Sequence, residues 1–273
     1  MRQLNRRQRT LLLLLLTLSV LLAVTLAGAL LTQRATETDF FRMNRSPSLT
    51  FLFGTDWMGR DMLARTLAGL SLSIRIGVLT ALVSAVIALL CGVAAALSRR
   101  ADAVLSWCID LFLGIPHILL VMLISLAFGR GFLGVVAGVS LSHWPSLARV
   151  IRGEVLSLRH APYLLAAEKL GVSRRQIVRR HLLPYLLPQF LTGLILQFPH
   201  AILHEASVTF LGFGLSSEQP AIGVILSESM QYLTTGRWWL ALFPGLALVG
   251  VVLLFAALGE QVRRVLDPSS VHQ

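Results

Sequence analysis

The chain has 273 residues, of which 55% are hydrophobic and 14% charged, and its formal net charge is +11. Soluble domains carry about 25% charged residues, so this composition indicates a membrane protein. A basic balance can mark nucleic-acid binding. Here the basic residues flank long apolar runs, so we expect contact with membrane lipid and no nucleic-acid partner. Cys91 and Cys108 lie in apolar stretches without metal-ligand spacing, which favours packing over a disulfide or a zinc site.

The first apolar stretch, residues 11–31, is long enough to cross a bilayer, which needs about 20 mostly apolar residues. Its basic head and small residues also resemble a signal peptide. Because its apolar run exceeds the usual span of about 7–15 residues in a signal core, we expect an uncleaved anchor. With the outer segment that follows, it forms a predicted first part, residues 1–70, and residues 71–273 form the second.

The outer segment contains the stretch G-T-D-W-M-G-R-D at residues 54–61, followed by Arg65 and Gly69. On its own this pattern is typical of a tight loop with an Arg–Asp pair at the surface, where such pairs contribute little stability. A structural element at the outer membrane face is the alternative. The positions concerned are Gly54, Thr55, Asp56, Gly59, Arg60 and Asp61.

Three further spans are predicted at residues 72–97, 104–128 and 132–147, the last being short and rich in glycine. Ionisable groups inside spans usually face the protein interior or a water-filled path. Asp110 is therefore either a structural hydrogen-bond partner or a functional residue, and His117 is a further candidate. His143 lies near the inner end of its predicted span, where it could simply reach the membrane interface.

A very basic segment, residues 149–185, follows the fourth predicted span. Gly171 can adopt the left-handed conformation that ends a helix. Ser173 and Gln176 have the spacing of a capping box that starts another helix, and Pro184 marks the start of the next span. The pattern predicts a helical hairpin, which could also lie simply at the lipid headgroups.

The fifth predicted span, residues 186–210, carries His200 and His204 four positions apart, on one face of the helix, with Glu205 beside them. Imidazole is a good ligand for nickel, zinc, copper and iron. We expect no permanent metal site, but His200 and His204 could bind a metal transiently. The alternative is that both rings hydrogen-bond to neighbouring helices.

The last predicted span covers residues 239–262, and Glu260 is placed to pair with Arg263 at its end. Basic residues near membrane ends mark the cytoplasm. With both termini inside, the inner segments hold 16 of the 24 Lys and Arg residues and the outer segments hold 7. We therefore expect an all-α, multi-pass protein with six membrane helices and both ends in the cytoplasm.

Three separated motifs resemble one family. The basic segment has L-A-A, then Gly171, then H-L-L-P, with the spacing of the EAA-x3-G-x9-I-x-L-P motif of ABC importer permeases; Leu165 replaces the Glu and His181 the Ile. Residues 54–61 are similar to the GTD-x-x-GRD signature of dipeptide, oligopeptide and nickel permeases, and residues 205–214 to their EAS-x-SFLGLG segment. The resemblance covers about residues 53–268 and is nearest to the second permease type. The histidine at position 204 resembles the residue that permeases of the nickel and metallophore branch have there.

The resemblance implies a type I importer permease fold, in which a cytoplasmic hairpin couples the channel to an ATPase. It implies a subunit that moves a metal chelate, nickel or a small peptide into the cytoplasm by alternating access, in a bacterial inner membrane. The implied partners are a homologous second permease, one or two ABC ATPase subunits and an extracytoplasmic solute-binding protein. The implied coupling residues are Leu165, Ala166, Ala167, Gly171, His181, Leu183 and Pro184, and the translocation path would include Asp110, His200, His204 and Glu205.

The chain encodes no energy-coupling chemistry of its own. A phosphate-binding loop needs a lysine, and the only one, Lys169, stands outside any such motif. We expect no enzyme activity and no cofactor in this chain, with ATP and Mg²⁺ used by partner subunits. The rivals are a secondary transporter driven by an ion gradient, weakened by the lack of an internal repeat, and a membrane scaffold without transport. The scaffold would tolerate alanine at the path residues.

Overall fold

The computed structural model describes residues 6–158 and 161–266, and Arg2, Arg159 and the end of the predicted second part, residues 267–273, lie outside these ranges. The described chain is helical, with a single isolated bridge between Thr55 and Asp61 as its only extended pairing. The all-α prediction is confirmed for this part of the chain.

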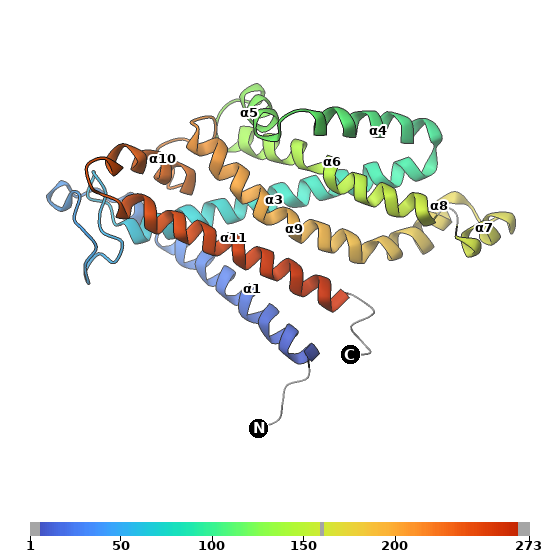
Figure 1. Cartoon of the computed structure of the whole chain (residues 1–273), viewed down its shortest axis with the longest axis horizontal. Helices are drawn as coiled ribbons and strands as arrows, with labels where there is room; N and C mark the ends of the chain where they lie inside the picture. The colour runs from blue at the N-terminus through green and yellow to red at the C-terminus, as the bar shows by residue number, and fades with distance from the viewer. Residues whose placement is uncertain (1–5, 159–160, 267–273) are drawn as a thin grey trace.

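Long helices form the body of the molecule and run roughly along its long axis (Figure 1). α3 is central and packs against α1, α6 and α9, while α11 packs against α1 and α9. α3 also runs through the predicted boundary between residues 70 and 71. The bounds of the long helices are Arg6–Leu30 for α1, Met62–Leu97 for α3, Phe132–Leu158 for α6, Leu183–Phe210 for α9 and Trp239–Leu266 for α11.

Short elements lie at both ends of the molecule (Figure 1). The outer segment, with α2 (Thr32–Thr36) and η1 (Phe40–Arg42), lies at the same end as α10 (Ile222–Leu233). The hairpin of α7 (Pro162–Lys169) and α8 (Arg174–Ile177) lies at the other end. The first turn of α1 and the last turn of α11 both lie away from α10 (Figure 1).

Four helical stretches of the described residues are long and apolar enough to cross a membrane: α1, α3, residues 175–210 and α11. The predicted span at residues 104–128 is not one continuous helix, because α4 (Arg99–Gly114) and α5 (His117–Ala127) meet at a bend of 101°. Pro116 disfavours helical geometry for the residue before it, and Ile115 is extended, with ψ 136°. Counting the bent pair as one span gives up to five among the described residues.

α6 contains the fourth predicted span, residues 132–147, but is not apolar enough to join that set. Its polar side chains Ser140, Ser142 and His143 are buried against neighbouring helices instead of facing lipid. A helix covered by protein needs less apolar surface than one that contacts lipid. The count of six spans therefore remains approximate.

Small residues bring α6 close to α5. Gly134 and Gly138 have the four-residue spacing that allows membrane helices to approach closely. A Cβ atom at Gly138 would lie 2.7 Å from the carbonyl oxygen of Val121 on α5. This close packing places the first residue of α5, His117, against the middle of α6.

Candidate functional site

The G-T-D-W-M-G-R-D stretch forms a buried charge network, which we call the outer charge cluster: Asp56, Arg60, Arg65 and Glu228. One oxygen of Asp56 accepts from Arg60 Nε and from Arg65 Nη1, both at 2.6 Å. Arg65 also donates to Glu228 at 3.0 Å, and the side chains of Asp56 and Arg65 are each only 3% exposed. Of the two alternatives, the weak surface pair is excluded, because the side chains of Asp56 and Arg65 are buried and their charges are balanced by one another instead of by water. Glu228 was missed since it lies 163 residues from Arg65 and no local pattern links them.

The other positions of this stretch shape the loop around the network. Gly54 and Gly59 have φ of 72° and 75°, in the left-handed region that favours glycine. A Cβ atom at Gly59 would lie 1.8 Å from the carbonyl oxygen of Asp39. The Thr55 hydroxyl donates to a backbone carbonyl of the same loop, and the Asp61 side chain caps α3 by accepting from two backbone N–H groups. The signature holds the outer segment onto α3.

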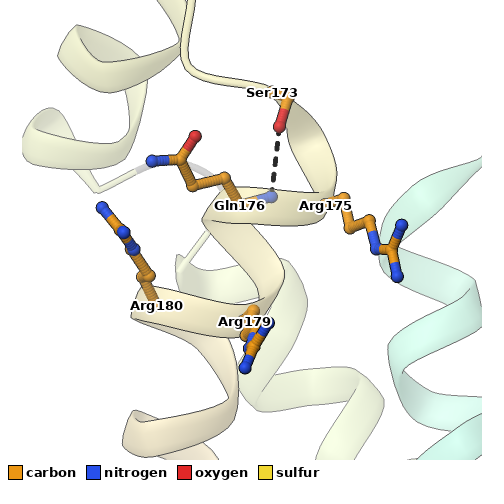
Figure 2. A pocket seen from close by; sticks show the side chains of 5 residues that line it. All are labelled: Ser173, Arg175, Gln176, Arg179 and Arg180. Atoms are coloured by element: carbon orange, nitrogen blue, oxygen red, sulfur yellow. Dashed lines mark hydrogen bonds between the residues drawn. The ribbon is translucent and has the colours of Figure 1, made fainter.

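The hairpin has the turn chemistry that its sequence predicts. Gly171 has φ 81°, and the N–H of Val172 donates to the carbonyl of Ala167 at 3.1 Å, which is the bond that closes a Schellman helix end. Ser173 Oγ accepts from the backbone N–H of Gln176 at 3.3 Å and caps α8 (Figure 2). The predicted helix–turn–helix is confirmed.

The hairpin is anchored to the body on one side and exposed on the other. Leu164 and Leu182 are buried in a cluster that includes Ile151 and Val155 of α6. This packing joins the hairpin to α6. Of the motif residues, Ala167 and His181 are partly buried, and the exposed ones are Leu165, Ala166, Gly171, Leu183 and Pro184.

A π-helical turn, η2 (Val178–Leu182), joins α8 to α9. Pro184 stands in the first turn of α9, and proline cannot supply a backbone N–H to the preceding turn. The wider π-helical turn of η2 accommodates the missing hydrogen bond. Around this junction, five polar residues line an open hollow of about 430 Å³, and Figure 2 shows Arg175 and Arg180 on opposite sides of it; the set is Ser173, Arg175, Gln176, Arg179 and Arg180.

Asp110 lies at an exposed position on α4, where it accepts from Arg149 of α6 at 2.5 Å. A second pair joins the same two helices, because Arg152 Nε donates to Asp102 at 2.5 Å. This hydrogen bond raises the pKa of the Arg152 guanidinium. Asp110 is thus a link between α4 and α6 on an exposed face, in line with the hydrogen-bonding alternative.

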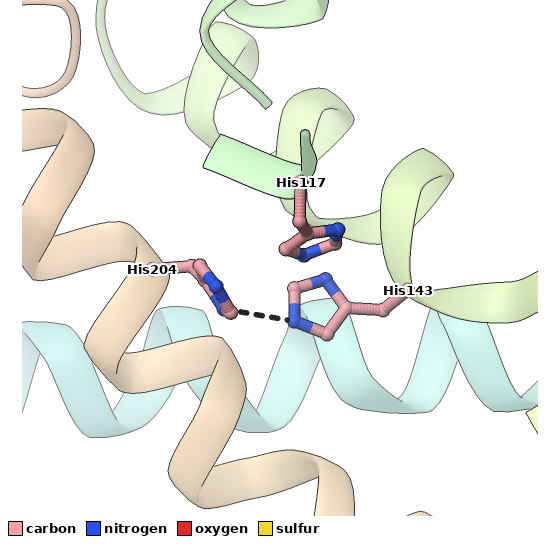
Figure 3. A group of neighbouring side chains, drawn as sticks. All are labelled: His117, His143 and His204. Carbon is pink, nitrogen blue, oxygen red and sulfur yellow. Dashed lines mark hydrogen bonds between the residues drawn. The ribbon is translucent and has the colours of Figure 1, made fainter. Parts of the chain in front are cut away.

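His204 lies next to His117 and His143, and we call these three residues the histidine cluster (Figure 3). The ring centroids are 4.4 Å apart for His117 and His204, 4.5 Å for His117 and His143, and 4.9 Å for His143 and His204. Nδ1 of His143 donates to the carbonyl of Val139 at 2.9 Å. His143 is buried, so the expectation that it reaches the membrane interface is wrong.

The other predicted path residues lie outside this cluster. The His200 side chain is exposed, and its backbone carbonyl accepts from Nδ1 of His204 at 2.8 Å. Glu205 is fully buried and accepts from Thr209 at 3.1 Å. Sequence spacing could place His200 and His204 on one helix face, but it carried no signal for contacts between His204 and helices α5 and α6. At the end of α11, Glu260 pairs with Arg264 at 2.9 Å instead of the predicted Arg263.

Comparison with known proteins identifies the class to which this fold and these motifs belong. Residues 84–271 match the family described as the inner membrane component of binding-protein-dependent transport systems. The chain belongs to this family: it is a permease subunit of an ABC importer and a multi-pass inner-membrane protein. Membership implies ATPase and binding-protein partners in general, and members are transport permeases, not enzymes.

Individual relatives support the same assignment. The chain is 36% identical over 267 residues to a peptide transport system permease protein of Brucella suis biovar 1 (strain 1330), covering 98% of this chain and 90% of that one. It is 31% identical over 226 residues to the dipeptide transport system permease protein DppC of Bacillus subtilis (strain 168), covering 82% and 71%. A solved structure of inward-facing conformations of the MetNI methionine ABC transporter shares the fold, with a TM-score of 0.60, 19% identity, and coverage of 76% of this chain and 98% of that one.

Proposed function

We propose that this chain forms one half of the membrane channel of an ATP-driven importer that carries small peptides into the cytoplasm. The observation that carries the proposal is the exposed hairpin, whose L-A-A-x3-G-x9-H-L-L-P residues keep the spacing of a coupling motif and lie opposite the outer segment (Figure 1). The relatives named for peptide and dipeptide transport support the choice of cargo.

In the proposed mechanism the hairpin docks into a groove of an ATPase subunit. Small side chains at Ala166 and Ala167 allow close approach, and Leu165 offers an apolar contact that is 43% exposed. Closure of the ATPases on ATP pushes the hairpin, and the buried Leu164 and Leu182 pass the movement to α6 and α9. The channel then alternates between two conformations that differ in affinity for cargo and nucleotide.

The proposed assembly contains a homologous second permease, one or two ABC ATPase subunits and an extracytoplasmic binding protein. The ATPases use ATP and Mg²⁺, and this chain carries neither. The hairpin and both chain ends face the cytoplasm, which agrees with the excess of basic residues in the predicted inner segments. Asp110, His200, His204 and Glu205 remain the proposed path residues, with Asp110 and His200 on exposed faces.

A metal chelate is the second candidate cargo. The specific observation that favours it is the histidine cluster, which brings three metal-binding side chains together in the helical bundle (Figure 3). It replaces the pair of His200 and His204 as the basis for this candidate.

Uptake in cells that carry the complete transport operon tests the proposal. Labelled dipeptide, Ni²⁺ and the Ni²⁺–histidine complex are offered to cells with the chain, without it, and with it restored. Loss and recovery of dipeptide uptake are expected. Loss of metal uptake alone would move the assignment to the second candidate, and unchanged uptake of every cargo would contradict both.

A further inference from the structure

We infer that the histidine cluster binds a divalent first-row transition-metal ion. His117, His143 and His204 come from three different helices, and one ring nitrogen from each lies within 4.8 Å of the others. Metal–nitrogen distances of about 2.0–2.1 Å put the nitrogens around one ion about 3–3.5 Å apart. Small rotations of the side chains are enough to close the remaining gap.

Backbone carbonyls prepare two of the rings for this role. The carbonyls of Val139 and His200 can only accept, so Nδ1 of His143 and Nδ1 of His204 carry the protons. Each ring therefore keeps a lone pair on Nε2. In the structure Nε2 of His143 accepts a hydrogen bond from Nδ1 of His204 at 3.2 Å (Figure 3), and an ion bound to Nε2 of His143 would replace this bond. A metal-binding histidine commonly donates its other ring N–H in this way, which fixes its tautomer and orientation.

The third ring, that of His117, lies beside the other two without a hydrogen bond to orient it among the described residues. Among the described residues, no hydrogen bond holds the ring of His117, which starts α5 directly after the 101° bend. The bend and the close packing of α5 on α6 bring this ring to 4.5 Å from the ring of His143. An untied imidazole beside two oriented ones can turn toward an ion.

The position and charge of the cluster suit transient binding of a metal ion or its chelate during transport. His117 and His204 are partly exposed, which leaves a route for exchange, whereas His143 is buried. Three neutral imidazoles leave the ion's charge uncompensated and leave coordination positions open, so an ion that arrives with a small anionic chelator suits the site. This place on the cargo's path rests on the function proposed above, but binding of the metal itself does not.

The test measures Ni²⁺ binding to the complete purified importer, prepared without a histidine tag, by equilibrium dialysis with Ni²⁺ alone and with the Ni²⁺–histidine complex. The variants are H143Q, H204Q and H117Q, and T192A is the control because Thr192 lies on α9, like His204, but outside the cluster and the proposed path. H117Q is expected to disturb folding less than H143Q, since His117 is only partly buried.

We expect about one Ni²⁺ per copy of this chain, with affinity reduced at least about tenfold by each cluster variant that assembles and unchanged in T192A. Absence of binding to the wild type, equal loss in T192A, or full affinity in H117Q would overturn the inference. Binding of the chelate but not of bare Ni²⁺ would identify the chelator as part of the ligand.

ATP-driven dipeptide uptake by the same preparations separates the two claims. Uptake of dipeptide without Ni²⁺ binding would remove the metal site and leave the proposed function standing. Ni²⁺ binding through the cluster without ATP-driven uptake of dipeptide or chelate would leave the metal site standing and remove the proposed function.

Discussion

At the scale of single residues, burial decides which charges hold the structure together. Asp56 sits between two arginines and is almost fully buried, whereas the pair of Glu260 and Arg264 at the end of α11 is exposed. Removal of one partner from a buried network leaves the others uncompensated. The same removal at the surface costs little because water solvates the remaining charge.

We therefore predict that D56N destabilises the protein by about 3–5 kcal/mol, since Arg60 and Arg65 would lose their shared partner. E260Q should change stability by less than about 1 kcal/mol. Thermal unfolding of the detergent-purified importer, followed by loss of the assembled complex in gel filtration, measures both. Equal unfolding temperatures for D56N and wild type would show that the outer charge cluster is not structural.

The histidines show where prediction from sequence stops at this scale. His117, His143 and His204 each stood out as ionisable groups in apolar stretches, but their meeting depends on a bend at Pro116 and on glycine-mediated packing of α5 on α6. Pro116 and the four-residue spacing of Gly134 and Gly138 are visible in the sequence, but they do not predict which helices meet or that three histidines come together. Turn chemistry at Gly171 and Ser173 is local, and it was predicted correctly.

At the scale of elements, the hairpin turns at one left-handed residue, Gly171, which has φ 81°. No atom lies within 4 Å of a Cβ placed on Gly171, so a substitution there acts on backbone conformation alone. Left-handed geometry costs an ordinary L-residue about 1–2 kcal/mol, and asparagine tolerates it better than a β-branched residue.

The expected result is that G171V misaligns α7 and α8 and uncouples transport from ATP hydrolysis, whereas G171N retains most coupling. Dipeptide transported per ATP hydrolysed should fall several-fold in G171V with the complex still assembled. The assay compares both variants in reconstituted vesicles. If G171V couples as well as G171N, the turn does not transmit force.

Long helices were predictable as elements because their apolar runs are continuous. Several predicted boundaries match the structure, such as the ends at Leu97 and Phe210. Others do not, as with α3, which starts at Met62 instead of Leu72. The break between α4 and α5 was not predicted, although Pro116 stood in the middle of the stretch, because a proline in an apolar run is compatible with both a kinked helix and a sharp bend.

At the scale of the whole molecule, the outer segment lies at one end and the exposed hairpin at the other (Figure 1). The histidine cluster lies in the helical bundle, on α5, α6 and α9. Two of these helices, α6 and α9, are tied to the hairpin by its buried leucines and by η2. Movement of the hairpin is therefore expected to reach the cluster.

The most direct test of the central claim is dipeptide accumulation in sealed proteoliposomes that contain the complete importer and receive the binding protein outside and ATP inside. Our account predicts accumulation that needs ATP and this chain and survives collapse of ion gradients by ionophores. Accumulation that continues without the ATPase subunits and stops with ionophores would contradict it in favour of a secondary transporter. Full accumulation in vesicles that lack this chain would show that it is not part of the channel.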